Sequence, residues 1–450
     1  MTSTGAVQVD LGDRSYPIEF RPIKEIGATL AGLHKPGKCV VVTNDVVGPL
    51  YGQIVQDSLR SAGWAPEYIE LEDGEAKKTT DTYIGLVNRL LELQVDRKTP
   101  VVAVGGGVTT DIAGFAAATT MRGLPFANVP TTLLAQVDAS VGGKTGVNTS
   151  HGKNLLGAFW QPFLVHVAVD ALDTLSDPEY RCGLGEVVKH AVLEEKQDPS
   201  DPSKWVPSTE FFEWLEANAE AIVARDQEAL KHTVRRCCEI KAAVVSQDER
   251  ESGKRALLNL GHTVGHAVEA VVGYGGLRHG EAVAMGTVAE THLAVLRGCC
   301  DASVPERIAS LLRKLQLPTG LEGLKTDDLV KASFMDKKRE QAHITVTMPH
   351  SIGDVRLVKI TPEELIPAFE SLTTNAGSAD AAREEDASSK GGAGNGGASN
   401  GEANGAAPPS PPSANSFASG AHQNSENFMT GRPTTRVHQP PGGASSIIFG

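Results

Sequence analysis

Apolar strand-like runs alternate with helix-like segments through the first 120 residues, and this alternation most limits the possible folds of the chain. The elements expected, in chain order, are a β-hairpin at 5 to about 25, strands at 38–47 and 65–79, helices at 50–62 and 81–93, and a strand, glycine-rich turn and helix at 99–120. Such alternation predicts a parallel sheet of Rossmann type.

Polar residues and glycines follow these predicted strands. Asn44, Glu75 and the run Gly105–Gly107 all fall at carboxyl ends of strands, where sheets of this kind bind their ligands. The run GGGVTTD, residues 105–111, suits a nucleotide pyrophosphate because glycines allow close approach and the following helix offers free N–H groups. A tight structural turn would have a similar sequence, and the pattern is neither GxGxxG nor a P-loop.

Histidines gather in the stretch 259–285. His262 and His266 are four residues apart, so both face one side of a helix, and His279 follows on a glycine-rich connection. Upstream, Glu186 and Lys189 are three residues apart. One carboxylate with two imidazoles is a common ligand set for a catalytic divalent metal. The alternative is a pair of core histidines with a solvated glutamate, and spacing alone does not select which two histidines would bind.

The segment 128–162 is rich in small hydroxylated residues and glycines and carries the isolated cations Lys144 and Lys153. This composition predicts a loop around a polar, anionic ligand. A flexible surface loop is the alternative, although the apolar LLGAFW that closes the segment argues against it.

Helical patterns dominate from about residue 177 to 372. Helices are expected at 211–223, 227–245 and 305–314, a β-hairpin around the turn at 349–352, and an exposed loop at 197–208. We therefore predict a Rossmann-like domain at 1–176 and a mostly helical domain at 177–372, with the active site in the cleft between them.

The composition changes again near residue 373. Residues 373–450 are dominated by Gly, Ala, Ser, Asn and Pro, and a segment with so few large apolar side chains is expected to be disordered. Its last part, 427–450, regains apolar and basic residues and is interpreted as a short linear motif.

The formal net charge of -13 argues against non-specific binding of nucleic acid or of an anionic membrane. An anionic substrate would therefore need a local cluster of basic groups. The six cysteines show no CxxC spacing, which indicates free thiols in a reducing cytoplasm. We expect no membrane span and no targeting segment, because strand-like alternation starts almost at once.

Five sequence blocks together closely resemble the 3-dehydroquinate synthase family over residues 6 to 372. They are MRGLPFANVPTTLLAQVDASVGGKTGVN, GKNLLGAFWQP, GLGEVVKHA, LLNLGHTVGHAVEA and LRHGEAVAMG. The resemblance implies a Rossmann-like domain followed by a helical domain, in a homodimer. It also implies NAD and one divalent metal, with Zn²⁺ expected and Co²⁺ as the alternative. The family converts 3-deoxy-D-arabino-heptulosonate 7-phosphate into 3-dehydroquinate and phosphate by transient oxidation, phosphate elimination, reduction and aldol closure.

The resemblance also assigns residues. The metal ligands would be Glu186, His262 and His279, while His266 would meet the substrate phosphate. The residues assigned to NAD are Asn44, Glu75, Lys78, Gly106, Gly107, Asp111, Thr131, Thr132, Lys153 and Thr174. The other residues assigned to substrate and catalysis are Arg122 (from the neighbouring subunit), Asp138, Lys144, Asn154, Lys189, Lys241, Arg255, Asn259 and Lys338, with Lys337 as the alternative to the last.

Two departures from the family pattern stand out. Thr109 and Thr110 replace the usual Ile-Gly before Asp111, and β-branched side chains there are expected to crowd the pyrophosphate. Gly185 in GLGE replaces the usual alanine. Related sugar phosphate cyclases that act on sedoheptulose 7-phosphate are the alternative, but their valiolone branch typically lacks the second histidine, here His266.

A second resemblance concerns the end of the chain. NFMTGRPTTRVHQPPGGASSIIFG, residues 427–450, resembles the RPxTxVxxPPGG motif of the SPIRAL and Jupiter families of microtubule-associated proteins. It implies contact with microtubules through the tail, and the alternative is an inert tail.

Overall fold

The computed structural model describes residues 5–273, 276–335 and 343–373. The predicted disordered tail lies outside the described residues from residue 374 onward. All described residues fall into one compact unit. Within the described ranges no helix is long and apolar enough to cross a membrane.

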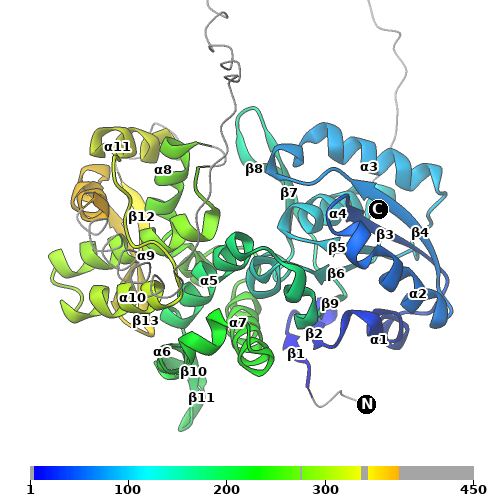
Figure 1. Ribbon diagram of the computed structural model, residues 1–450, viewed down its shortest axis with the longest axis horizontal. Helices are drawn as coiled ribbons and strands as arrows, with labels where there is room; N and C mark the ends of the chain where they lie inside the picture. Colours follow the sequence, from blue (N-terminus) through cyan, green and yellow to red (C-terminus); the bar gives the residue numbers. More distant parts are fainter. Residues whose placement is uncertain (1–4, 274–275, 336–342, 374–450) are drawn as a thin grey trace, which may run out of the picture. The chain divides into compact units, whose positions relative to one another are not determined.

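A seven-stranded sheet forms the first part of the chain, in the order β1-β2-β9-β6-β5-β3-β4 (Figure 1). Its strands are β1 (Val7–Val9), β2 (Tyr16–Phe20), β3 (Lys38–Asn44), β4 (Ala65–Leu71), β5 (Val101–Gly105), β6 (Phe126–Pro130) and β9 (Leu164–Val167). The β1–β2 hairpin is antiparallel and every other pairing in this sheet is parallel. The predicted Rossmann-type sheet is confirmed.

Helices cover both faces of this sheet because its central strands are apolar on both sides. In β3, Cys39 and Val41 face a core formed with α1 (Ile26–Leu33) and α2 (Gln53–Ser61). Val40 and Val42 face the opposite core, formed with α3 (Thr80–Glu92) and α4 (Gly107–Thr119). Successive side chains of a strand point to opposite faces, so one apolar run supplies both cores.

The second part is mostly helical, as expected. Its helices are α5 (Asp177–Val192), α6 (Glu210–Val223), α7 (Gln227–Gln247), α8 (His262–Val272), α9 (His279–Leu296), α10 (Ser303–Lys314) and α11 (Thr326–Met335), and the hairpin β12 (Ile344–Ser351) with β13 (Asp354–Ile360) follows them. One hydrophobic cluster joins residues of β1, β2 and β9 to residues of α5, α6, α7 and α10. The sheet and these helices therefore share a core, and the division at residues 176 and 177 stays a prediction.

Short 3-10 or π turns connect the main elements. They are Gly12–Arg14, Ile23–Glu25, Gly48–Gly52, Glu75–Lys77, Thr120–Arg122, Ala135–Ala139, Val169–Thr174, Lys254–Asn259 and Pro362–Leu365.

Two segments expected to be loops contain strands. The segment 197–208 belongs largely to a hairpin of β10 (Glu195–Asp198) and β11 (Asp201–Pro207). Its turn residues misled the prediction: Asp198 Oδ1 accepts the Ser200 amide at 2.8 Å and so forms the turn between the two strands. The segment 128–162 includes the antiparallel hairpin of β7 (Lys144–Thr149) and β8 (Gly152–Phe159).

Candidate active site

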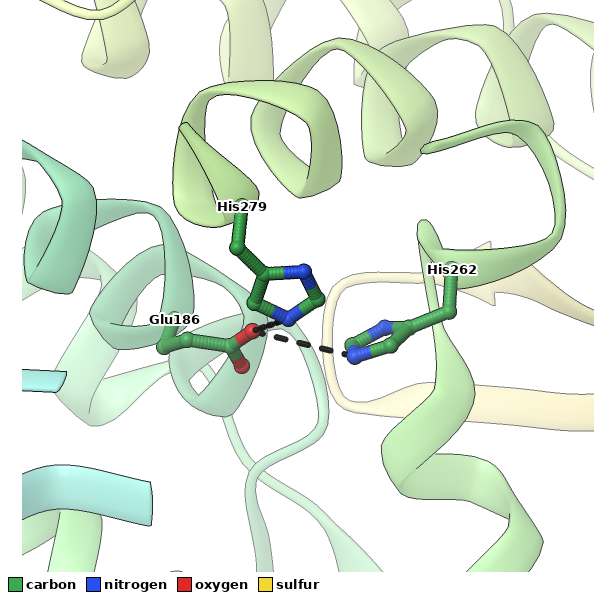
Figure 2. Close-up of side chains that lie close together, drawn as sticks. All are labelled: Glu186, His262 and His279. Carbon is green, nitrogen blue, oxygen red and sulfur yellow. Dashed lines mark ion pairs between the residues drawn. The ribbon is translucent and has the colours of Figure 1, made fainter. Parts of the chain in front are cut away.

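Three helices bring the expected metal ligands together. Glu186 lies within α5, and His262 and His279 are the first residues of α8 and α9. The Oε1 atom of Glu186 is 3.3 Å from His279 Nε2 and 3.8 Å from His262 Nε2. Both imidazole rings point toward the carboxylate (Figure 2). The expectation that His279 lies on a glycine-rich connection is wrong, because His279 begins a long buried helix.

Glycines set the spacing of these helices. A Cβ on Gly185 would overlap the carbonyl oxygen of Gly280, so α5 and α9 are in backbone contact beside Glu186 and His279. A Cβ on Gly286 would likewise overlap the carbonyl oxygen of Gly261, where α8 meets α9. The departure from the family pattern at Gly185 thus lies in the α5–α9 contact that spaces two of the ligands.

The carboxylate of Glu186 is fully buried. Burial opposes its ionisation, but the positive charge of Lys189 together with His279 and His262 outweighs burial and holds the pKa of Glu186 below its usual value. Lys189 forms an ion pair with Glu186. By hydrogen-bond geometry, however, neither carboxylate oxygen has a partner among the described residues. A buried anion held only by ion pairs is a suitable ligand for a cation.

The two histidines differ in protonation. Burial lowers the pKa of His262 to about 3, which keeps its imidazole neutral. Its Nδ1 lies 3.0 Å from the carbonyl oxygen of Leu260, so a proton on Nδ1 leaves the Nε2 lone pair directed at Glu186. For His279, burial is outweighed by contacts with Glu186 and Glu269, which raise its pKa to about 10. A metal ion bound here would have to displace that proton.

The ligand atoms of Glu186, His262 and His279 all lie within 4.8 Å of one another. One carboxylate oxygen and two imidazole nitrogens are ligands that Zn²⁺ and Co²⁺ accept, and such a set leaves positions for water or substrate. The residues present therefore fit a catalytic divalent metal.

Glu269 belongs to this site although it was not among the expected residues. Its carboxylate lies 3.5 Å from His279 Nδ1 and 3.6 Å from Lys153 Nζ. Glu269 follows His266 by three residues, so the helical spacing that grouped the histidines also indicated this carboxylate. Together His266, Glu269 and His279 form a second set of close ligand atoms that shares His279 with the first.

Asp138 forms a second buried charge cluster beside Glu186. Lys189 Nζ is 3.6 Å from its Oδ2, Lys241 forms an ion pair with its carboxylate, and His190 Nε2 lies 3.9 Å away. Burial raises the pKa of Asp138, but the two lysines outweigh it and hold this pKa well below its ordinary value. Burial lowers the pKa of Lys241 to about 8. His190 was not among the expected residues.

Lys144, Arg255 and Asn259 form a third group. The Glu251 carboxylate forms an ion pair with Lys144 Nζ at 2.6 Å and accepts a hydrogen bond from Asn259 Nδ2 at 3.0 Å. Arg255 is buried and donates from Nη2 to the carbonyl oxygen of Gly142 at 2.9 Å, while its Nε has no partner among the described residues. Glu251 was not among the expected residues.

Most residues assigned to NAD lie at the carboxyl ends of β3, β4, β5 and β6. Asn44 bonds Thr109 Oγ1 at 3.3 Å, and Lys78 bonds Asp111 and Asn154, each at 2.6 Å. Glu75 accepts a hydrogen bond from Asn148 Nδ2 at 2.8 Å, and Thr174 Oγ1 lies 2.7 Å from the Tyr51 hydroxyl. After β6, the Thr131 amide donates to the Gly105 carbonyl at 3.0 Å, and Thr132 Oγ1 accepts from the Ala135 amide at 3.2 Å. Lys153, on β8, contacts Glu269 of α8.

The start of α4 fits a dinucleotide pyrophosphate. Gly106 occupies the N-cap position and Gly107 is the first residue of the helix, so the N-cap residue itself supplies no capping side chain. Amides without a capping side chain at a helix N-terminus suit a phosphate group. The buried hydroxyl of Thr131 also has no partner among the described residues.

Thr109 and Thr110 are buried in the first turn of α4. Both are 2% exposed, so their side chains face into the protein. Thr110 Oγ1 donates to the Gly107 carbonyl at 3.1 Å within α4, and Thr109 accepts from Asn44. Hydroxyls bonded inward argue against the expected crowding, and the effect of the two threonines on NAD binding stays a prediction.

Two expected phosphate ligands are Arg122 and Lys338. Arg122 is exposed, has a φ of 65°, and forms no ion pair with another residue that the structure describes. Lys338 and its alternative Lys337 lie outside the described residues.

Comparison with known proteins places this site in a family. A family model for the 3-dehydroquinate synthase N-terminal domain matches residues 68–182, and one for the C-terminal domain matches residues 183–339. The 3-dehydroquinate synthase of Desulforamulus reducens is 44% identical over 362 residues, covering 80% of this chain and 97% of the relative. That of Geobacter metallireducens is 45% identical over 354 residues, covering 78% of this chain and 95% of the relative.

Solved structures share the fold. The 2-epi-5-epi-valiolone synthase of Streptomyces hygroscopicus, with NAD⁺ and Zn²⁺ bound, is 28% identical with a TM-score of 0.71 and covers 81% of this chain and 98% of that one. A 2-deoxy-scyllo-inosose synthase complexed with carbaglucose-6-phosphate, NAD⁺ and Co²⁺ is 22% identical with a TM-score of 0.71, covers 81% and 99%, and shows the fold alone. The chain belongs to the 3-dehydroquinate synthase family.

Proposed function

We propose that this enzyme converts 3-deoxy-D-arabino-heptulosonate 7-phosphate into 3-dehydroquinate and phosphate, with NAD and a divalent metal as cofactors. The convergence of Glu186, His262 and His279 on one buried position supports this most strongly. Two contacts of the β7–β8 hairpin connect the sheet to the metal ligands. Asn154 of this hairpin bonds Lys78, which follows β4, and the neighbouring Lys153 contacts Glu269 on α8, the helix that carries His262.

Glu186, His262 and His279 would hold the metal. When bound, the metal acts as a Lewis acid that lowers the pKa of a substrate hydroxyl. The chain prepares the site in advance: burial keeps His262 neutral, Lys189 keeps Glu186 ionised, and Leu260 fixes the proton of His262 on Nδ1.

The NAD site would be built from the carboxyl ends of the parallel strands and the start of α4. When bound, NAD accepts a hydride and later returns it, which transiently acidifies the neighbouring C–H bond of the substrate. Asn44 donates a hydrogen bond to Thr109, and Lys78 and Asp111 form an ion pair at 2.6 Å. These contacts would orient the four side chains before NAD binds.

The basic residues supply the positive field that a chain of net charge -13 otherwise lacks. Lys144, Arg255, Lys189 and Lys241, with Asn259, Asp138 and Asn154, would orient the carboxylate, hydroxyls and phosphate of the substrate. Lys144 is paired with Glu251 at 2.6 Å, so a substrate anion would exchange with that carboxylate. His266 lies beside the metal ligands, its ring centroid 5.3 Å from that of His262, and would meet the phosphate.

The same proposal includes a homodimer in the cytoplasm. Exposed Arg122 would complete the phosphate site of the neighbouring subunit, and Lys338 would approach the same phosphate. Mixing R122A with an inactive H279A variant tests the shared site, because hybrid dimers would regain part of the activity that each variant lacks alone.

Phosphate release tests the reaction itself. The purified protein with NAD and Zn²⁺ should release phosphate from the heptulosonate phosphate, and a chelator should stop this release. Release from sedoheptulose 7-phosphate alone would instead favour the related cyclases.

For the tail we propose microtubule contact through residues 427–450, on the strength of the motif resemblance. Co-sedimentation of the full chain with microtubules, compared with a chain that ends at residue 372, tests it. Equal pelleting of the two chains would assign the tail no such role.

A further inference from the structure

Glu290 is a buried carboxylate of α9 that has no part in the function described above. It is 0% exposed and lies eleven residues after His279, about three helical turns along the same helix. A fully buried carboxylate requires strong hydrogen-bond donors, so its partners indicate its role.

Those partners are backbone amides at the start of the neighbouring helix α8. Glu290 Oε2 accepts the Gly261 amide at 2.7 Å, and Oε1 accepts the Val264 amide at 3.1 Å. The first amides of a helix have no partner within the helix and are usually bonded by the side chain at the N-cap. Here the N-cap is Gly261, which has no side chain. Glu290 therefore caps α8 from another helix.

Gly261 is required at this position. It has a φ of 78°, in the left-handed region that favours glycine. A Cβ at Gly261 would also lie 2.5 Å from Thr287 Oγ1 of α9, closer than side chains approach. The start of α8 thus lies directly on α9, and the carboxylate of Glu290 bonds the first turn of α8 to α9.

His262 is the residue that follows Gly261, and its Nε2 is directed at Glu186. His279, at the start of α9, is directed at the same carboxylate. The bond between Glu290 and α8 therefore links the two helices that carry the histidine ligands. A shift of α8 along α9 would change the separation of the two rings, whose centroids are 5.2 Å apart.

We propose that Glu290 is a positioning residue for the metal: by bonding the first turn of α8 from within α9, it fixes His262 relative to His279. This inference rests on the proposed function, because it assumes that the two histidines bind one cation. The carboxylate of Glu290 also lies at the N-terminal, positive end of the α8 dipole, a position that favours a carboxylate.

Cobalt provides the test, because the visible absorption of Co²⁺ reports on the geometry of its ligands. We compare the wild type, Glu290→Gln and Thr291→Val by titration with Co²⁺ and by absorption spectroscopy. Thr291 is the matched control: it is equally buried on α9, but its hydroxyl bonds Thr287 of the same helix at 2.7 Å and not α8. Glutamine retains the shape of the side chain but presents N–H groups to one of the two amides.

We expect E290Q to bind Co²⁺ about tenfold more weakly with a shifted spectrum, as for other residues that orient metal ligands, while T291V matches the wild type. If Glu290 only caps the helix, E290Q would lower the unfolding temperature but keep the wild-type Co²⁺ affinity and spectrum. That result would overturn the proposal. If E290Q does not fold, E290D keeps the charge but shortens the reach, and wild-type binding there would overturn it equally. Failure of the wild type to bind Co²⁺ would instead refute the metal site itself.

Discussion

Replacing Lys189 is expected to reduce the stability of the enzyme most when no metal is bound. Its ammonium and the carboxylate of Glu186 are 1% and 0% exposed and form an ion pair. Replacing Lys189 by methionine would leave the Glu186 carboxylate buried without its main counter-charge. Breaking such a pair typically costs about 3–5 kcal/mol, because one charge stays buried. For a chain of this size that corresponds to a fall of roughly 4–6 °C in the unfolding temperature.

The metal makes this prediction specific. A divalent ion on Glu186 supplies the lost positive charge, so K189M should lose clearly less stability with saturating Zn²⁺ than with a chelator. The assay is thermal unfolding of the wild type, K189M, E186Q and the double variant, each with and without Zn²⁺. Lys189 also lies 3.6 Å from Asp138, so the double variant separates the two partners. In it the carboxylate charge is absent, and most of the loss should be recovered.

The reasoning would be refuted if K189M unfolded within about 1 °C of the wild type in chelator. It would also be refuted if K189M and the double variant were equally unstable, because the cost would then come from Asp138 and not from Glu186.

Three further predictions concern other parts of the structure. Burial lowers the pKa of His166 to about 4, and its Nε2 lies 3.1 Å from the Pro22 carbonyl oxygen. The unfolded chain takes up this proton near pH 6.5 and the folded chain only near pH 4, so stability should fall by about 2 kcal/mol between pH 7 and 5 through this group. Urea unfolding of H166Q should show a correspondingly smaller pH dependence, and an unchanged dependence would contradict the assignment. Glu269→Gln should weaken Zn²⁺ binding by about 10–100-fold by removing the carboxylate beside His279 Nδ1, measured by chelator competition, and unchanged affinity would exclude that role. A chelator should lower the unfolding temperature of the wild type, since a ligand at 100 times its Kd adds about 2.7 kcal/mol, whereas H262A should respond little, and equal responses would place the metal elsewhere.

Much of the architecture followed from local sequence patterns. The parallel sheet was predictable because the strands that become β3 and β5 carry valines on both faces and helical segments separate them along the chain. The hairpin expected around 349–352 is present as β12 and β13, but its turn lies at Ile352 and Gly353, because Pro349–Ser351 belong to β12. The β10–β11 hairpin was missed because its Pro, Ser and Asp residues are typical of loops, and the backbone pairing that makes it a hairpin leaves little mark on composition.

The site shows where sequence reasoning ends. His262, His266 and Glu186 were found because helical spacing marks a shared face. The position of His279 at the start of α9 was missed because the surrounding glycines indicated a loop, whereas Gly280 serves close packing against Cys182 of α5. The partners Glu251 and Glu290 could not be predicted, because each contact joins elements whose approach depends on tertiary packing.

The central claim is that Glu186, His262 and His279 hold one cation. X-ray absorption spectroscopy of the zinc-loaded enzyme measures this directly. We predict one Zn²⁺ per chain with two imidazole nitrogens and at least one oxygen among its ligands, and the loss of one imidazole in H262A and in H279A. A zinc ion without histidine ligands, or a spectrum unchanged in both variants, would contradict the account.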